Sequence, residues 1–147
     1  MIDRIDTFTA WQHIAGCKSI SFEEFSLLKP FGRKGSFPES LVLESCVELS
    51  RWLTAASSSF ERASVLESIE RFELGRGAGC GDVLRITADV IHRKAQALRI
   101  ACEVCAGNAT VASGEISVGL LPLTEGFDAD LIYGMWRELY RGSHGSA

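Results

Sequence analysis

Long hydrophobic runs are missing from this chain of 147 residues. No apolar stretch approaches the roughly 20 residues that a helix needs to cross a bilayer. The opening residues 1–8 carry charges where a signal peptide has an apolar core. We therefore expect a cytoplasmic protein that does not enter a membrane.

The chain also lacks an excess of basic residues. It has 15 Lys and Arg against 19 Asp and Glu, which gives a formal net charge of −4 at pH 7 and a pI near 5.4. Nucleic acids and acidic membrane surfaces are bound by basic faces that displace counterions. We therefore expect neither as a partner, whereas small acyl ligands are compatible with this charge.

Neither a disulfide framework nor a complete metal motif is present. The 5 cysteines are an odd number, scattered along the chain, and are expected to be reduced thiols in the core. Cys102 and Cys105 have the spacing of half a zinc site, but a strand sends residues three apart to opposite faces. No metal and no other cofactor are therefore expected.

Repeats and low-complexity linkers are absent as well. With 46% hydrophobic and 23% charged residues, the chain has the balance of a compact soluble protein. We expect a single domain over residues 1–147, consisting of a core at residues 1–121 and a C-terminal helical extension at residues 122–147.

The N-terminal part of the chain is expected to contain a strand, a loop and then a helix. Apolar and β-branched residues predict a strand over residues 1–8 that continues through residues 11–20. Residues 25–40 contain prolines and glycines, which predict a loop crossing. A helix is predicted over residues 45–57, with Ser45-x-x-Glu48 as its capping box. Because this helix is apolar around most of its circumference, other structure should surround it.

The following segments alternate with the period of a strand. Strands are predicted over residues 66–74, 83–91, 97–105 and 109–120, and Gly107-Asn108 predicts a hairpin turn. Several strands in sequence after one buried helix indicate an antiparallel sheet curled around that helix. The fold class is therefore α+β.

The C-terminal extension has the pattern of an amphipathic helix. Asp128 is a candidate cap at its start and Gly142 a candidate stop, and residues 143–147 are expected to fray. One stripe of this helix is apolar and should dock on the core: Leu131, Ile132, Met135, Trp136, Leu139 and Tyr140.

Short motifs over residues 1–120 resemble the 3-hydroxyacyl-ACP dehydratases of fatty acid synthesis, a hotdog-fold family. The matching segments are the first strand, a Gly-His-Phe-Pro-like motif at Gly35-Ser36-Phe37-Pro38, the helix at residues 45–57, Arg71-Phe72, and Cys80-Gly81-Asp82. The resemblance implies a curled antiparallel sheet around a long central helix. The family's leading helix is missing here, and the C-terminal helix is added.

The resemblance also locates the family's catalytic pair. In that family a histidine of the Gly-His-Phe-Pro motif removes a proton beside the thioester carbonyl, and a helix carboxylate handles the leaving hydroxyl. Here the matching positions are Ser36 and Ser50, which cannot perform these proton transfers near neutral pH. None of the 3 histidines, His13, His92 and His144, has a local partner that marks it as catalytic.

Substrate contacts are implied by the same resemblance. The positions are Phe37, Pro38, Glu44, Ser45 and Cys46, and the backbone N–H at Ser45 is expected at the start of the helix, where it could polarise a thioester carbonyl. Glu44 stands where the family has proline and is a candidate base for water in a thioesterase-like reaction.

Two basic clusters are candidates for docking an acidic acyl carrier protein. One is Arg33 and Lys34, close to the motif loop, and the other is His92, Arg93 and Lys94, at the end of a predicted hairpin. A solvated turn is the alternative interpretation of each cluster.

Three functions stay open at this stage. The first is a dehydratase homologue that binds acyl-ACP or acyl-CoA without standard catalysis, or that supplies half of a site to a second hotdog subunit. The second is an active dehydratase or isomerase, with catalytic groups relocated or given by a partner, and the third is a thioesterase that uses Glu44 or Glu48. The resemblance implies a homodimer or higher oligomer in each case.

Overall fold

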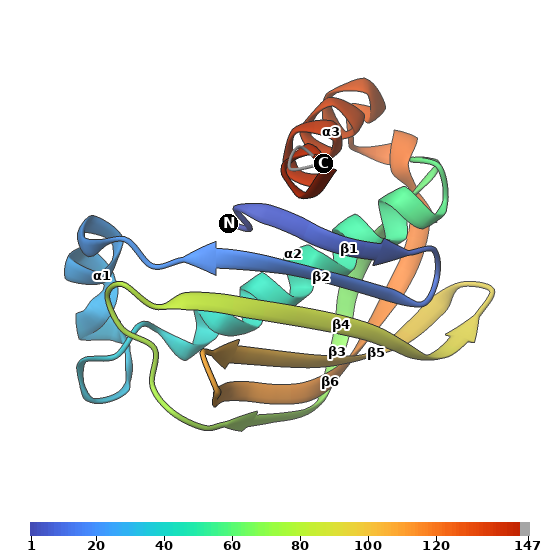
Figure 1. Cartoon of the computed structure of the whole chain (residues 1–147). Coiled ribbons are helices and arrows are strands. Elements are labelled where there is room, and N and C mark those ends of the chain that lie inside the picture. Colours follow the sequence, from blue (N-terminus) through green and yellow to red (C-terminus); the bar gives the residue numbers. More distant parts are fainter. Residues whose placement is uncertain (145–147) are drawn as a thin grey trace.

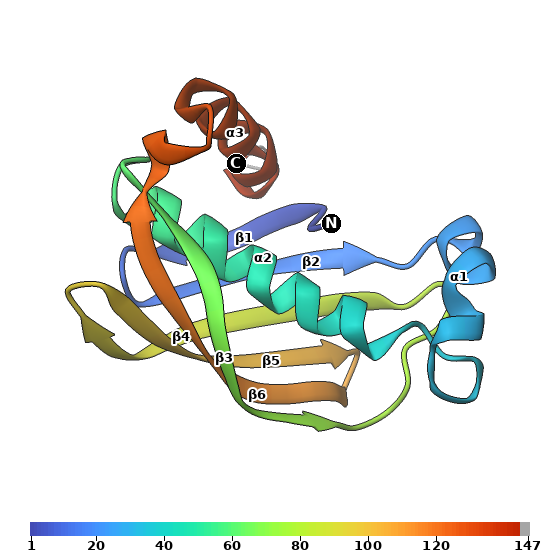
Figure 2. The ribbon, with the colours of Figure 1, turned by 180° about the vertical axis from the view of Figure 1, so that it is seen from behind.

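The computed structural model describes residues 1–144 of the chain. Within these residues, a 6-stranded antiparallel sheet curls around one long helix (Figures 1 and 2). Along the sheet the strands have the order β1-β2-β4-β5-β6-β3. Their bounds are β1 Arg4–Thr9, β2 His13–Ser19, β3 Arg62–Leu74, β4 Val83–Lys94, β5 Ala97–Ala106 and β6 Ala109–Pro122. The predicted α+β architecture is confirmed.

The central helix α2, Glu39–Ser57, begins well before the predicted residue 45. Pro38 stands at its N-cap, and Ser45 lies inside it, so the predicted capping box of Ser45 and Glu48 is wrong. Buried side chains occur all along its length, as predicted for a helix that other structure surrounds. No helix in the described residues is both long and apolar enough to cross a membrane.

The predicted long N-terminal strand is a hairpin instead. Strands β1 and β2 pair antiparallel, and Trp11 in the turn has a φ of 57°, which is unusual for a bulky residue. The segment after β2, most of which was predicted to be a loop, contains helix α1, Phe22–Leu28, and the short 3₁₀ helices Lys29–Phe31 and Arg33–Gly35. None of the side chains of α1 is fully buried, although Phe25 and Leu28 pack partly buried against the core.

Strands β4 and β5 follow the predicted alternation. The side chains that face the helix are buried, and they form much of the core: Leu84, Ile86, Ala88, Leu98, Ile100, Cys102 and Val104. Gly107 has a φ of 59° in the turn between β5 and β6, as the hairpin prediction requires. Strand β3 begins at Arg62, earlier than predicted, and forms an edge of the sheet because it pairs only with β6.

Helix α3, Ala129–His144, follows a 3₁₀ turn at Leu123–Glu125. The Asp128 carboxylate accepts hydrogen bonds from the backbone N–H groups of Asp130 (3.1 Å) and Leu131 (3.2 Å), which confirms the predicted cap. The helix continues through Gly142, so this glycine does not end it. The apolar stripe docks only in part: Trp136 is buried in the core, whereas Leu131 and Met135 stay exposed. Residues 145–147 lie outside the described chain.

Candidate functional site

The loop around Ser36 is held closely against the segment that follows β3. The Ser36 hydroxyl donates a hydrogen bond to the Arg33 carbonyl at 2.5 Å, and the Phe37 N–H donates to the Ala78 carbonyl at 2.8 Å. A Cβ atom on Gly77 would lie only 2.9 Å from that of Ser36, so the Gly77 backbone lies directly against the Ser36 side chain. The free space beside Ser36 is about 10 Å³, which is room for about one water molecule.

Ser50 lies on α2 and is fully buried. Its hydroxyl donates to the Cys46 carbonyl one turn earlier, at 2.9 Å. The helix begins at Glu39, next to the Ser36 loop, and Ser50 is roughly 16 Å further along its axis. Ser36 and Ser50, which the resemblance matches to the family's catalytic pair, are therefore not brought together within one chain.

The predicted thioester contact at Ser45 needs correction. Because α2 begins at Glu39, the Ser45 N–H is inside the helix and is not one of the free donors at its start. The Ser45 side chain is buried and donates to the Leu41 carbonyl at 3.0 Å. Glu44, the candidate base, stands on the exposed side of α2 and pairs with Arg51 at 3.0 Å.

Cys46 and Phe37 are core residues in this structure. Cys46 is fully buried against Cys102, and the hydrogen bond between the two thiols together with burial raises the pKa of Cys46 well above its ordinary value. It therefore remains a neutral thiol at physiological pH. Phe37 and Pro38 are buried at the entry to α2, where the Lys18 ammonium lies 5.9 Å from the Phe37 ring centroid.

The two basic clusters lie at opposite ends of the sheet, so they do not form one docking patch (Figure 1). Arg33 is already engaged, because its guanidinium donates to the Gly75 carbonyl at 3.0 Å and pairs with Glu39 at 3.4 Å. The Lys34 side chain lies outside the described part of the chain. At the β4–β5 hairpin, the Arg93 guanidinium stacks 4.1 Å from the Trp11 ring centroid.

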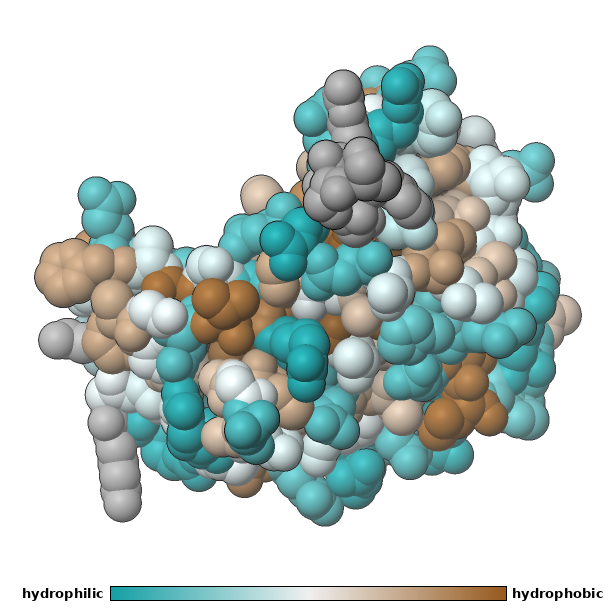
Figure 3. All heavy atoms as spheres, in the orientation of Figure 1, coloured by the Kyte–Doolittle hydropathy of each residue, from teal (hydrophilic) through white to brown (hydrophobic). Residues whose placement is uncertain are grey.

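Apolar side chains also gather on the surface at the end where α1 lies (Figure 3). Phe22, Leu27 and Phe31 are each more than two-thirds exposed, at 73%, 74% and 78%. The surface near the Ser36 loop is therefore partly hydrophobic, which the sequence pattern of α1 did not indicate.

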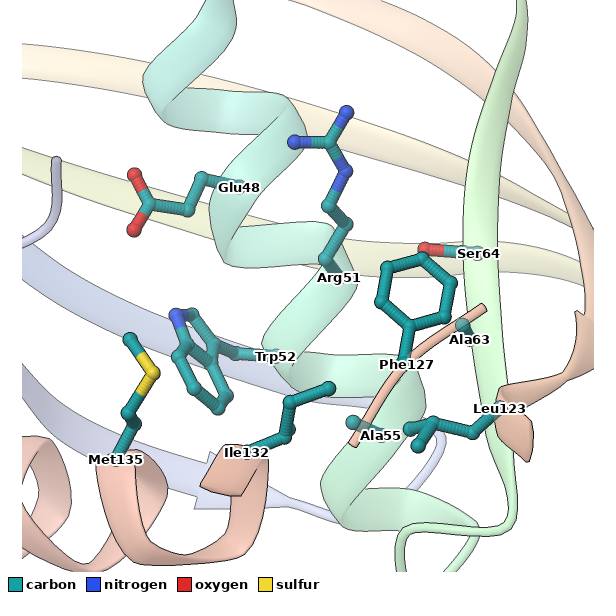
Figure 4. Close-up of a pocket in the computed structure, with 10 residues that line it drawn as sticks. All are labelled: Glu48, Arg51, Trp52, Ala55, Ala63, Ser64, Leu123, Phe127, Ile132 and Met135. Atoms are coloured by element: carbon teal, nitrogen blue, oxygen red, sulfur yellow. The ribbon is translucent and has the colours of Figure 1, made fainter. Parts of the chain in front are cut away.

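A pocket of about 250 Å³ lies between α2, β3 and the C-terminal extension (Figure 4). Its walls are mainly apolar, with Glu48 and Arg51 on the α2 side: the residues are Glu48, Arg51, Trp52, Ala55, Ala63, Ser64, Leu123, Phe127, Ile132 and Met135. Sequence reasoning missed this pocket because its walls come from segments far apart in the chain. Glu48, predicted as a capping residue, instead accepts a hydrogen bond from the Ile2 N–H at 3.1 Å.

A second arrangement that the sequence did not reveal surrounds His13. Its Nδ1 lies 2.7 Å from a carboxylate oxygen of Asp89, and its Nε2 lies 3.1 Å from the Thr7 hydroxyl. The three residues come from β2, β4 and β1, and the side chains of His13 and Asp89 are 34% and 53% exposed. Water therefore reaches this cross-strand network, which fits a surface contact between strands.

Comparison with known proteins identifies the fold. No family model matches the sequence. A 3-hydroxyacyl-[acyl-carrier-protein] dehydratase FabZ from Sorangium cellulosum (strain So ce56) is 27% identical over 124 residues, which cover 82% of this chain and 80% of the dehydratase.

Two solved structures are similar to the whole arrangement of sheet and helix. A hot-dog-like protein from Thermanaerovibrio acidaminovorans has a TM-score of 0.65 and 15% identity, with 88% of this chain and 92% of that chain covered. A hypothetical thioesterase with coenzyme A from Streptococcus pneumoniae TIGR4 has a TM-score of 0.65 and 13% identity, with 81% and 85% covered. The chain therefore has the hotdog fold, and its sequence is similar to that of a dehydratase.

Proposed function

We propose that this chain binds acyl thioesters, as acyl-ACP or acyl-CoA, without carrying out ordinary dehydration. The similarity to a dehydratase that acts on acyl-carrier-protein substrates supports the ligand class. One observation supports the loss of catalysis: Ser36 and Ser50, which the resemblance matches to the family's acid–base positions, each donate a hydroxyl hydrogen bond to a backbone carbonyl. A serine hydroxyl held in this way cannot remove a proton from carbon near neutral pH.

A second copy of the chain is part of the proposal. Strand β3 is a sheet edge of 13 residues, and it exposes Val65, Leu66, Ile69 and Leu74 at 44%, 37%, 46% and 42%. A long, apolar edge presents unpaired backbone groups and favours pairing with another strand. Symmetric pairing of two β3 strands would place the Ser36 loop of one copy beside the first residues of β3 in the other, because the strands run antiparallel.

Turnover measurements test the proposal. Purified protein is incubated with crotonyl-CoA and with a 3-hydroxyacyl-ACP, while enoyl absorbance and free thiol are followed together. We expect neither signal to change above the rate without protein. Formation or hydration of the alkene by the wild type would contradict the proposal and would indicate catalytic groups elsewhere in the site or in a partner subunit.

A double variant provides the positive control. Ser36→His with Ser50→Glu restores the family's residue types, and gain of dehydration would show that the scaffold still positions substrate. Because Ser50 is fully buried, the fold of the variant is checked by circular dichroism and thermal unfolding. The wild-type result decides the proposal whether or not the variant folds.

Thioester hydrolysis is the second candidate function, and the position of Glu48 favours it. This carboxylate lies on the wall of the 250 Å³ pocket and is 23% exposed, so it could activate a water molecule beside a bound thioester. It also pairs with the N-terminal ammonium at 3.8 Å. Release of free thiol by the wild type, lost in Glu48→Gln and kept in Glu44→Gln, would support hydrolysis over binding alone.

A further inference from the structure

A hollow of about 280 Å³ lies at the end of the sheet opposite α1. The β1–β2 turn and the β4–β5 hairpin meet there, where the Val90 N–H donates to the Gln12 carbonyl at 2.8 Å (Figure 1). We call this space the hairpin hollow, and it is lined by Trp11, Arg62, Arg93, Lys94, Ala95 and Leu120. Three of these residues are cationic and none of them is acidic, so the hollow presents positive charge to the solvent.

The positive charges of the hairpin hollow are not balanced by the protein. Within the described part of the chain, no ion pair joins Arg62, Arg93 or Lys94 to a carboxylate. By contrast, Arg99 on the neighbouring strand β5 pairs with Glu70 at 3.4 Å. The whole chain has a formal net charge of −4, so a group of three unpaired cations is a local feature that its composition does not explain. Such a group attracts an anion.

Two of the three cations are held in place by neutral groups. The Arg62 guanidinium donates to the Ala95 carbonyl at 3.0 Å and to the Gln96 side-chain oxygen at 2.8 Å, which leaves its other N–H groups able to donate. The Arg93 guanidinium lies 4.1 Å from the Trp11 ring centroid, as in a cation–π contact. Neutral partners orient an arginine without cancelling its charge. An anion would therefore meet guanidinium groups that are already ordered, which favours binding.

Trp11 provides its ring from a backbone conformation that bulky residues rarely adopt. Its φ is 57°, in the left-handed region, and its N–H donates to the Ser57 hydroxyl at 2.8 Å. Glycine or asparagine would occupy this turn position more easily. A disfavoured conformation that surrounding contacts maintain occurs preferentially at functional sites. Here it holds the indole ring against Arg93 at the wall of the hairpin hollow.

We propose that the hairpin hollow binds the diphosphate group of a small molecule. Its three cations match the several negative charges of a diphosphate, and guanidinium groups bind phosphate oxygens through paired N–H donors. Trp11 and the buried Leu120 exclude part of the water that would screen these charges. Specific docking of a protein surface buries a contact area far beyond one hollow of this size, so a small anion fits better. The inference does not rest on thioester binding.

Calorimetric titration of the full chain with sodium pyrophosphate tests the site. We expect saturable binding of pyrophosphate, and binding of sulfate that is about tenfold weaker at the same ionic strength because sulfate is too short to contact all three cations. ADP is titrated in parallel: a tighter ADP complex supports a nucleotide as the ligand, and a tighter pyrophosphate complex supports the free anion. Equal binding of pyrophosphate and sulfate would indicate general attraction of charge and would overturn the proposal.

Matched variants locate the binding. Arg93→Gln should weaken pyrophosphate binding about tenfold, whereas Arg85→Gln, on the same strand β4 but outside the hairpin hollow, should leave it unchanged. Trp11 acts by positioning Arg93, so Trp11→Leu should weaken binding and Trp11→Phe, which keeps a ring face, should retain most of it. Equal effects of Arg93→Gln and Arg85→Gln would show that the anion binds elsewhere.

Two further results would give the cations another role. If they serve the fold alone, Arg93→Gln lowers the Tm and the wild type does not bind pyrophosphate. If they dock an acidic protein, the wild type binds an acyl carrier protein but not pyrophosphate. Either result overturns the diphosphate site and leaves the proposed thioester binding standing, because that proposal is tested by turnover and by thioester ligands.

Discussion

The indole ring of Trp136 lies 6.1 Å from that of Trp52, measured between ring centroids, and this contact ties α3 to the central helix α2. Trp136 also meets Phe8 of β1 edge-on at 5.2 Å. A single side chain thus connects the C-terminal extension to both the sheet and the helix.

Trp136→Ala should lower the free energy of unfolding by about 3–5 kcal/mol, because the Trp136 side chain is buried, with 9% exposure, and its loss leaves a cavity. Leu131→Ala on the same helix is the control, since Leu131 is 62% exposed, and it should change stability by less than about 0.5 kcal/mol. Urea unfolding measures both. Equal effects of the two variants would show that α3 is not anchored through Trp136.

Stability should depend on pH through Asp82. Partial burial raises the pKa of this carboxyl, but hydrogen bonds from Arg76 and from the Gly79 N–H outweigh burial and hold the pKa below its usual value. The ionised carboxylate therefore stabilises the fold above the unfolded pKa of about 3.9, and this contribution is lost as pH falls through the lower folded value.

Arg76→Gln is expected to lower stability at pH 7 by up to about 1 kcal/mol and to have a much smaller effect at pH 2. Arg85→Gln, at an exposed position on β4, is the control for loss of a positive charge. Denaturant unfolding at the two pH values checks this, and an Arg76→Gln effect that persists unchanged at pH 2 would refute the role of Asp82.

Pairing of β3 strands predicts the effect of a charge on this edge. Ile69→Lys should convert a dimer to a monomer in light scattering, because a lysine on an edge strand opposes strand pairing. Ile91→Lys on β4 is the matched control, as Ile91 is 49% exposed and Ile69 46%. A dimer that survives Ile69→Lys would place the interface elsewhere.

Carrier docking is expected at the β4–β5 hairpin more than at Arg33, whose guanidinium is engaged by Glu39 and Gly75. Arg93→Glu with Lys94→Glu should weaken acyl-ACP binding about tenfold, with a strong dependence on salt. Binding of the same acyl group on uncharged pantetheine should not change. An unchanged affinity for acyl-ACP would remove the hairpin from the docking surface.

The sequence predicted those parts of the fold that depend only on neighbouring residues, namely the alternation of strands and the capping of a helix. Ile86 lies between the polar residues Arg85 and Thr87 on a half-buried sheet, and the Asp128 cap depends only on residues next to it in the chain, so these predictions are confirmed. The hairpin at Trp11 was missed because tertiary contacts hold a bulky residue in a left-handed conformation. Its N–H donates to the Ser57 hydroxyl at 2.8 Å, a contact between distant segments.

Local sequence patterns could not predict where α2 begins, and they could not predict the pocket. Ser45-x-x-Glu48 matches a capping box by residue type, but the helix extends back to Pro38, where the buried Phe37 fixes the entry of the chain. The pocket depends on how α3 docks against α2 and β3.

The central claim, thioester binding without dehydration, is tested most directly by recovering the ligand after binding. 3-Hydroxyhexanoyl-CoA is titrated into the protein in a calorimeter, with CoA alone as the control, and the ligand is then analysed by mass spectrometry. The account predicts saturable binding that exceeds that of CoA and recovery of unchanged ligand. Absence of binding, or recovery of the dehydrated enoyl-CoA, would contradict it.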